Sequence, residues 1–182
     1  MELVDLDRIL KLTNLKEEQR TGWQIQNVDR PETVAAHSWG ASLLTLLVDT
    51  ERSIDRQKAV RMAILHDIEQ SLTGDIPTRP DTDRDVFDRE LDAAEALLDG
   101  QDEMLETWKE KQRMETFEAK FVEDMEQLDM VIQALRYEKD QRYGEDGSMD
   151  EFFRTADQNI QTDPGKELFK KVRREYESCK EE

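Results

Sequence analysis

Apolar residues recur every three or four positions along most of this 182-residue chain, which is the period of an amphipathic α-helix. A first helix is predicted after Pro31, because proline is favoured in the first helical turn. Its inward face would carry Val34, His37, Ala41, Leu44 and Val48. After a polar break over 50–55, a second helix is predicted from Asp55, a good N-cap. One side of this helix would carry Val60, Ala63, Ile64 and Asp67.

A longer apolar stripe predicts a major helix in the second half of the chain. Its members are Phe117, Phe121, Met125, Leu128, Ile132 and Leu135. Residues 73–83 hold one glycine and two prolines, so they predict a loop, and a helix resumes near Asp85. Residues 143–150 predict a turn. Two further helices would follow it, the first from Ser148 or Asp150 and the last from Pro164.

The remaining pattern is compatible with helices alone. A short N-terminal helix is predicted before the connection 14–23. No stretch alternates apolar and polar residues convincingly enough to predict a strand. The length suits one domain with a core that needs no disulfides. We therefore expect an all-α helical bundle that forms a single domain over residues 1–182.

The charge of the chain limits its partners. It holds 44 acidic and 26 basic side chains, for a net charge of −18, and 38% of its residues are charged. Such a surface repels nucleic-acid backbones and anionic membranes, so we expect neither a polymer-binding role nor a membrane partner. The same excess of acidic groups is typical of proteins that stay soluble in high salt, where their repulsion is screened. A halophilic source is therefore a hypothesis.

The single cysteine bears on the compartment. Cys179 has no second cysteine with which to form an intrachain disulfide, so a reducing, cytoplasmic location is the simplest interpretation. The first ten residues show neither the basic segment nor the apolar run of a signal peptide. No apolar stretch approaches the ~20 residues that a bilayer-spanning helix needs.

Two histidines are the most informative residues for chemistry, because the chain contains no others. His37 lies on the predicted inward face of one helix, and His66 is followed by Asp67 near the end of the next. Imidazole nitrogens and carboxylate oxygens both bind divalent cations. Adjacent helical residues point about 100° apart, so His66 and Asp67 can reach one ion only at a helix end or across a groove.

A fourth ligand should come from a more distant helix. Asp129 is the best candidate because it lies between Met125 and Ile132 on an apolar side, where an uncompensated carboxylate is costly. A lone histidine on an apolar face is usually a core residue. The order of an inward His, an HD pair, a Gly-Asp-Ile-Pro-Thr loop and an inward Asp favours a metal site instead.

These motifs resemble the HD-domain metal-dependent phosphohydrolases, and within them the branch that contains the 5'-deoxynucleotidases. The similarity runs from about residue 10 to residue 140. The matching residues are Arg20, Trp23, Asn27, Pro31, Glu32, Val34, His37, His66, Asp67, 74–78 and Asp129. The resemblance implies an all-α HD-domain bundle with one divalent ion on His37, His66, Asp67 and Asp129.

The resemblance also implies hydrolysis of a phosphate monoester, in which the cation polarises the phosphoryl group and acidifies a bound water. Asp75 would contact the sugar hydroxyl of a nucleotide, and Trp23 would pack on its sugar or base. Arg20 would bind the phosphate, since a guanidinium matches phosphate oxygens bidentately. Thr78 is a further candidate for substrate binding. Each of these also has a structural interpretation: Asp75 as a loop cap, Trp23 as a core aromatic and Arg20 as a solvated charge.

The chain departs from the family at two positions. Gln70 occupies the place of a glutamate that serves as general acid and base in the relatives, and a glutamate lies one step earlier, at Glu69. Three explanations are open. Glu69 has taken over this role, or the protein binds metal and nucleotide with little or no turnover, or Gln70 is a deliberate, near-isosteric replacement of the glutamate. Gly22 occupies the place of a phosphate-binding arginine of some bacterial relatives, and Arg20 is its candidate substitute.

Three functions follow. The first is a metal-dependent phosphohydrolase that acts on small nucleotides, foremost deoxynucleoside 5'-monophosphates. The second is a non-catalytic protein of the HD fold that binds metal and nucleotide, and the third is a phosphohydrolase of nucleoside triphosphates. Open coordination positions would favour Mn²⁺, Co²⁺ or Mg²⁺, with Zn²⁺, Ni²⁺ and Fe²⁺ as alternatives. We expect a homodimer, for which Phe152, Phe153 and Phe169 are candidates as either interface or core.

Overall fold

The computed structural model describes residues 5–76 and 84–180. Within these two ranges the chain forms helices and no strand, apart from an isolated bridge between Gln19 and Thr33. The elements are α1 (Leu6–Leu12), the 3-10 helix η1 (Thr13–Lys16), α2 (Thr21–Ile25), α3 (Val34–Leu47), α4 (Arg56–Leu65), α5 (Gln70–Thr73), α6 (Arg84–Leu97), α7 (Asp102–Arg113), α8 (Phe117–Lys139), α9 (Asp150–Asn159) and α10 (Asp163–Lys180). The predicted all-α class is confirmed.

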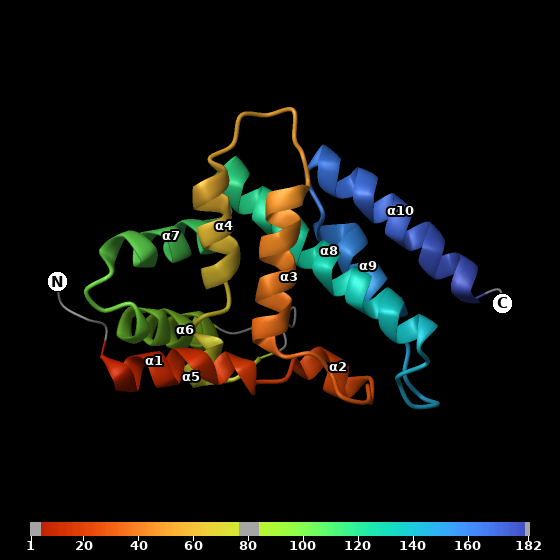
Figure 1. Ribbon diagram of the computed structural model, residues 1–182, viewed down its shortest axis with the longest axis horizontal. Coiled ribbons are helices and arrows are strands. Elements are labelled where there is room, and N and C mark those ends of the chain that lie inside the picture. The colour runs from red at the N-terminus through yellow and green to blue at the C-terminus, as the bar shows by residue number, and fades with distance from the viewer. Residues whose placement is uncertain (1–4, 77–83, 181–182) are drawn as a thin grey trace.

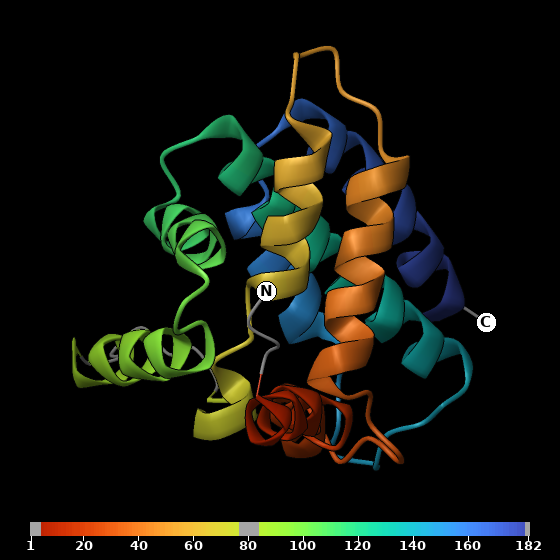
Figure 2. The same ribbon diagram turned by 60° about the vertical axis from the view of Figure 1, so that its left-hand side comes forward.

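Helix α8 lies at the centre of the bundle (Figure 1). Helices α3 and α4 lie side by side and both pack on α8, while α9 and α10 pack on it from the other side (Figure 2). Helix α7 contacts α4 and α8, and α6 lies beyond it near α1 and α5. The helices that carry the predicted metal ligands are therefore neighbours: α3, the end of α4, and α8.

The core explains why α8 is central. The predicted stripe of this helix is confirmed, because Phe121, Met125 and Leu128 are fully buried. Phe117, Ile132 and Leu135 are partly buried and pack against the same cluster. The cluster is completed by residues from other helices, namely Trp23, Tyr137, Phe153, Phe169 and Tyr176. A helix that packs on several sides positions any polar group on its surface accurately.

The two helices in front of α8 begin as predicted. The Thr33 side chain accepts a hydrogen bond from the amide of Ala36 and caps α3, and the Asp55 side chain accepts one from Lys58 and caps α4. The side of α4 that carries Ala63 and Ile64 is not uniformly buried, because Ile64 is 54% exposed. The buried face of α4 is formed by Ala59, Met62 and Ala63. Ile64 points away from this buried face.

Three other expectations are sharpened by the structure. The connection 14–23 is not irregular, since it contains most of η1 and the start of α2. Phe153 and Phe169 are buried in the core, and Phe152 packs on Trp23, so these residues belong to the core of one chain. Helix α9 begins at Asp150, one of the two predicted starts. In the part of the chain that the structure describes, no helix has the length and apolarity required to cross a bilayer.

Candidate metal and substrate site

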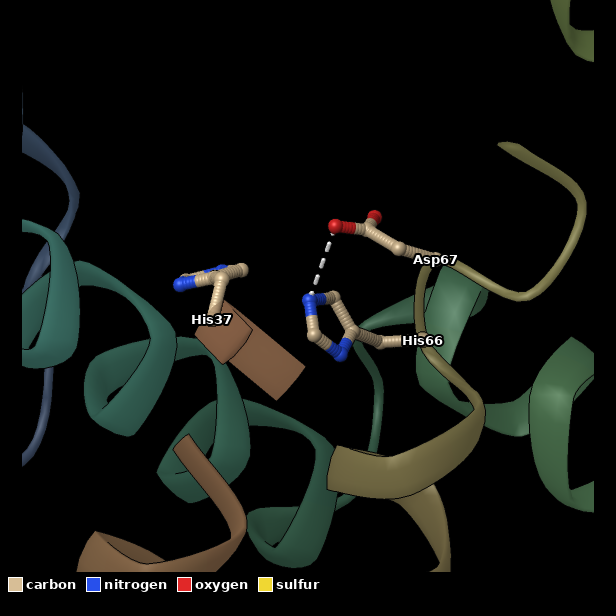
Figure 3. Close-up of side chains that lie close together, drawn as sticks. All are labelled: His37, His66 and Asp67. Atoms are coloured by element: carbon tan, nitrogen blue, oxygen red, sulfur yellow. Dashed lines mark ion pairs between the residues drawn. The ribbon is translucent and has the colours of Figure 1, made fainter. Parts of the chain in front are cut away.

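Two histidines and an aspartate meet where α3 and the end of α4 lie together (Figure 3). His37 lies near the start of α3 and His66 directly follows α4, and the two residues are 2% and 4% exposed. Their ring centroids are 5.2 Å apart, with an angle of 77° between the planes. Ligand atoms of His37, His66 and Asp67 all lie within 4.8 Å of one another. Three of the four predicted ligands are thus close enough to share one cation.

The end of α4 lets two neighbouring residues reach the same point. Helix α4 ends at Leu65, and the chain makes a turn over 66–69 before α5. In this turn Asp67 Oδ2 lies 3.0 Å from His66 Nε2. The prediction that the HD pair lies at a helix end is therefore confirmed.

The environment of His66 fits a cation. Its Nδ1 donates to the carbonyl oxygen of Ala63 at 2.9 Å, so in the neutral ring the lone pair is on Nε2. This nitrogen is buried and makes no hydrogen bond to any residue that the structure describes. A lone pair and the Asp67 carboxylate 3.0 Å away repel each other unless a positive charge lies between them.

The ionisation of the two rings supports the same conclusion. Burial lowers the pKa of His66, but Asp67 and Glu126 outweigh it and raise this pKa to about 9. The surroundings of His66 therefore favour a positive charge on its ring, next to the Asp67 carboxylate. Burial and the charge of Arg20 keep the pKa of His37 well below its usual value, so His37 is a neutral imidazole, the form that binds metals.

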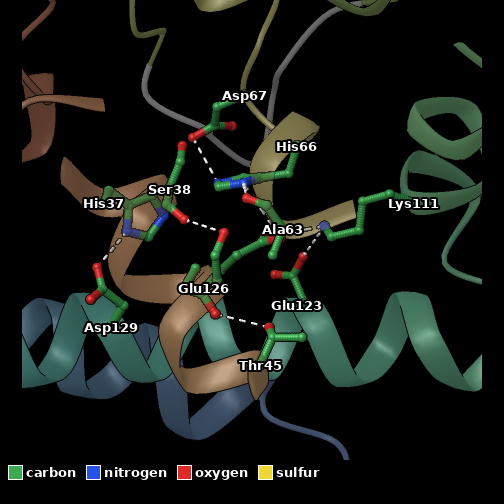
Figure 4. A network of polar contacts seen from close by, with 12 residues as sticks. His37, Ser38, Thr45, Ala63, His66, Asp67, Lys111, Glu123, Glu126 and Asp129 are labelled. Carbon is green, nitrogen blue, oxygen red and sulfur yellow. Dashed lines mark hydrogen bonds and ion pairs between the residues drawn. The ribbon is translucent and has the colours of Figure 1, made fainter. Parts of the chain in front are cut away.

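The fourth predicted ligand lies on the other side of His37 (Figure 4). Asp129 on α8 places its Oδ2 2.8 Å from His37 Nδ1. Asp129, His37 and Glu32 form a second group whose ligand atoms lie within 4.8 Å of one another. Burial raises the pKa of Asp129 to about 7, against the opposing charges of Arg20 and His66. His37 is common to both groups, so all four predicted ligands gather around it.

Arg20 brings the positive charge of the site. It is the N-cap residue of α2, and its Nη1 is buried without a hydrogen-bond partner among residues 5–76 and 84–180. Its charge opposes the rise that burial causes in the pKa of Glu32, Asp75 and Asp129. A buried guanidinium donor with no partner, surrounded by candidate ligands, suits an anionic ligand such as phosphate.

Trp23 is a core residue that reaches the site through another side chain. Its indole is 1% exposed and packs on Tyr137 and Phe152, with ring centroids 5.1 Å and 4.0 Å away. It therefore has almost no surface for the direct substrate contact that the resemblance implied. Its Nε1 donates to Glu32 Oε1 at 3.0 Å, while the Tyr137 hydroxyl accepts from the Glu32 amide.

Glu32 is a site residue that the ligand pattern did not identify. It lies five residues before His37, and burial raises its pKa to about 7 despite the charge of Arg20. Its carboxylate belongs to the group with His37 and Asp129. The signal for it was the matching segment after Arg30, which resembles the family and in which Glu32 is the acidic residue nearest to His37.

Asp75 joins the loop after α5 to the start of α2. Its Oδ2 accepts from the amide of Thr21 at 2.5 Å, and its backbone carbonyl accepts from the Thr21 hydroxyl at 2.8 Å. Burial raises its pKa, and the Thr21 hydrogen bond opposes this rise. Asp75 thus holds the helix whose N-cap is Arg20. Thr78, the other predicted substrate residue of this loop, lies outside the described residues.

The two candidate proton carriers differ in their surroundings. The carboxylate of Glu69 accepts from Trp108 Nε1 at 2.9 Å and is 3% exposed. Burial, and then the charge of Asp67, raise its pKa to about 8. Gln70 opens α5, and its Oε1 is buried with no hydrogen-bond partner in the described part of the chain. Glu69 is therefore tied to α7, whereas the end of Gln70 is uncommitted.

A buried ionic network lies next to His66 and involves Lys111, Glu123 and Glu126 (Figure 4). Lys111 of α7 is 4% exposed, and its Nζ lies 2.9 Å from Glu123 Oε2 and 3.1 Å from Glu126 Oε2. Glu126 Oε1 lies 3.9 Å from His66 Nδ1. Glu126 precedes Asp129 by three positions and so shares a face of α8 with it, but the spacing alone does not indicate the ion pairs with α7.

Comparisons with known proteins agree with the all-α fold and with the resemblance to the HD-domain family. The HD domain family matches residues 12–168. The 5'-deoxynucleotidase YGK1 of Saccharomyces cerevisiae is 30% identical over 159 residues, 82% of this chain and 72% of the yeast protein. The 5'-deoxynucleotidase HDDC2 of Bos taurus is 33% identical over 130 residues, 68% of this chain and 63% of the bovine protein, just under two thirds. The crystal structure of PH0347 from Pyrococcus horikoshii is similar with a TM-score of 0.79 at 30% identity, over 94% of this chain and 99% of that one.

Proposed function

Since the chain belongs to the HD domain family, we propose that it is a metal-dependent phosphohydrolase that releases phosphate from deoxynucleoside 5'-monophosphates. The observation that carries the proposal is the pair of His66 Nε2 and Asp67 Oδ2, 3.0 Å apart and suited to a cation. His37 completes this group, and Asp129 lies against His37. Relatives of about 30% identity are 5'-deoxynucleotidases, which supports the choice of substrate class.

We propose that the metal is held by His37, His66, Asp67 and Asp129. When bound, a divalent ion would polarise the phosphoryl group and lower the pKa of a coordinated water. Mn²⁺, Co²⁺ and Mg²⁺ are our first choices, and Zn²⁺, Ni²⁺ and Fe²⁺ the alternatives. The protein's part is to keep His37 neutral and to aim His66 Nε2 through the bond from its Nδ1 to Ala63.

The residues around the ligands supply substrate binding in this proposal. The unpartnered Nη1 of Arg20 donates to the phosphate. Asp75 keeps Arg20 in place through the start of α2 and presents its carboxylate to the sugar hydroxyl. Thr78 is a further substrate contact in the same loop. Trp23 acts indirectly, since its bond to Glu32 holds that carboxylate beside Asp129.

The proton carrier is the open part of the mechanism. A general acid or base must exchange protons, which the amide of Gln70 does not do. Glu69 has a carboxyl group, but its bond to Trp108 directs it to α7. We propose that turnover in this chain is slow, and that Gln70 marks the position where a carboxylate would accelerate it.

The test is a panel of nucleotides with purified protein and added Mn²⁺, Co²⁺ or Mg²⁺. Phosphate release from deoxynucleoside monophosphates, lost in Asp67→Asn, is expected. Pyrophosphate or triphosphate release from nucleoside triphosphates would select the triphosphate hydrolase instead. Binding of metal and nucleotide without turnover in both the wild type and Gln70→Glu would select the non-catalytic binding protein.

We further propose a homodimer through the outer face of α3 and α4. This face exposes Trp39 (69%), Leu46 (56%), Leu47 (67%) and Ile64 (54%). Helix α3 contains no charged residue, although 38% of the chain is charged, so two copies can approach here with little repulsion. Light scattering should give twice the chain mass for the wild type and the single mass for Leu46→Glu. A monomeric wild type would refute the proposal.

A further inference from the structure

We infer that Gly40 is a positioning residue that makes room for the carboxylate of Asp129 beside His37. The inference rests on the proposed function, because it concerns a ligand of the proposed metal. Gly40 lies on α3, three residues after His37, and is buried. It therefore faces α8 from the same helix as His37, the residue that belongs to both groups of candidate ligands.

The space beside Gly40 is taken by Asp129. A Cβ atom placed on Gly40 would lie 1.9 Å from Oδ1, 2.6 Å from Cγ and 3.1 Å from Oδ2 of Asp129. The first two distances are far shorter than any van der Waals contact. Asp129 Oδ2 meanwhile lies 2.8 Å from His37 Nδ1. The carboxylate thus occupies the volume that any other residue at position 40 would fill.

The backbone does not require glycine at this position. Gly40 lies in the interior of a regular helix, and the glycines with positive φ are Gly74 and Gly100 in the described residues. In a helix interior, glycine is a poor choice because alanine loses less conformational entropy. The approach of Asp129 is therefore the physical reason for a glycine here. A larger residue would rotate the Asp129 side chain away while leaving both helices in place.

The test is metal affinity rather than activity. Gly40→Ala should bind Co²⁺ or Mn²⁺ about 10- to 100-fold more weakly than the wild type, the usual effect of disturbing the support of a ligand. Its metal-free form should still unfold cooperatively, because only the Asp129 side chain has to move. Wild-type metal affinity in Gly40→Ala would overturn the inference.

A second glycine, which meets a carboxylate of the same central helix α8, provides a matched control. A Cβ atom on Gly165 of α10 would lie 2.4 Å from Asp124 Oδ2. Asp124 is a structural carboxylate, which accepts hydrogen bonds from the amides of Gln161 and Thr162 at 2.8 Å and 2.7 Å. Gly165→Ala should therefore lower the melting temperature and leave metal affinity unchanged. Equal losses of metal affinity in both variants would show a general packing effect and refute the inference.

A double-mutant cycle covers the case in which Gly40→Ala folds poorly. In Asp129→Ala the obstructing carboxylate is gone. The double variant Gly40→Ala/Asp129→Ala should therefore fold, and its metal affinity should equal that of Asp129→Ala alone. A further loss in the double variant would overturn the inference. A wild type that binds no metal would refute the proposed function and the inference with it. If the wild type binds metal but no more tightly than Gly40→Ala, the inference is refuted and the proposed function is not.

Discussion

At the scale of single residues, the orientation of His66 decides what the site can hold. The bond from Nδ1 to Ala63 leaves Nε2 facing the Asp67 carboxylate, an arrangement that favours a positive charge between them, as a proton or a metal ion. Arg20 adds a donor with no partner, and Gln70 an acceptor with no partner, among the described residues. Unsatisfied buried polar atoms are rare in folded proteins, so their concentration here is typical of a binding site.

Arg20 is expected to carry phosphate affinity. Arg20→Met should lower kcat/KM for a deoxynucleoside monophosphate by about 10- to 100-fold, since a hydrogen bond to a charged group contributes about 1.5–3 kcal/mol. Arg20→Lys should restore part of it, because lysine keeps the charge but loses the bidentate fork. Steady-state kinetics with Arg173→Met, which removes a surface ion pair, provide the control. Equal kcat/KM in Arg20→Met and the wild type would contradict the assignment.

Gln70 is expected to limit turnover. Gln70→Glu should raise metal-dependent phosphate release by at least about 10-fold, because general acid–base catalysis typically contributes 10²–10⁴-fold. Glu69→Gln should have little effect, since Glu69 is held by Trp108. Phosphate release under saturating metal measures both. If Glu69→Gln abolishes release and Gln70→Glu changes nothing, Glu69 is the proton carrier instead.

At the scale of elements, α8 connects the site to the core. One face carries Asp129 and Glu126 toward α3 and α4, while others pack Phe121 and Met125 into the bundle. Helix α7 is joined to this face through Lys111, which forms ion pairs with Glu123 and with the buried Glu126. The same ion pairs that fasten α7 to α8 therefore also set the charge next to His66.

Removal of Lys111 should destabilise this junction. Lys111→Met leaves Glu123 and Glu126 without their counter-ion, which costs about 3–5 kcal/mol for a buried pair. Burial raises the pKa of Glu123, but Lys111 outweighs it, so this pKa is lowered overall. The Lys111–Glu123 ion pair therefore stabilises the fold above the usual glutamate pKa, and its contribution is lost as the pH falls through the lowered pKa. Glu126 differs, because burial raises its pKa to about 7 even beside Lys111. Urea unfolding at pH 7 and at pH 4 should show the larger difference from wild type at pH 7.

The partly exposed pair of Lys58 and Glu110, 2.8 Å apart between α4 and α7, is the control for this experiment. Lys58→Met should cost only about 0–1 kcal/mol, because solvent screens such a pair. Similar losses from both substitutions, or a loss from Lys111→Met that does not depend on pH, would contradict the role given to the buried network.

At the scale of the whole molecule, charged side chains are unevenly distributed. The chain carries a net charge of −18, yet α3 has no charged side chain and exposes Trp39, Leu46 and Leu47. The acidic groups repel one another, and salt screens this repulsion. The net charge predicts that stability depends on ionic strength. The uncharged face of α3 predicts that a second copy would bind there, where repulsion is weakest.

Salt should therefore stabilise the fold. Between 0.1 M and 2 M KCl we expect the melting temperature to rise by about 4–8 °C, the effect of about 2 kcal/mol in a domain of this size. Thermal unfolding followed by circular dichroism measures this rise. An equal melting temperature at both salt concentrations would argue against adaptation to high salt.

The sequence by itself predicted the main helices and the candidate ligand set. The spacing of Val34, His37 and Ala41 sets the inward face of α3, and the stripe from Phe121 to Leu128 sets that of α8, because helical periodicity is a local property. The position of His66 at a helix end and of Asp129 among apolar residues followed from the same pattern, and the resemblance to a family supplied the chemistry.

Tertiary structure decided which neighbours those residues meet. It buried Trp23 behind Glu32, tied Glu69 to Trp108 on α7, and turned Ile64 outward. It also placed the Asp129 carboxylate in the space beside Gly40. These contacts join residues far apart in the chain, and no local period specifies them. The sequence therefore predicts the ligands, whereas packing determines their protonation, their support and the room they occupy.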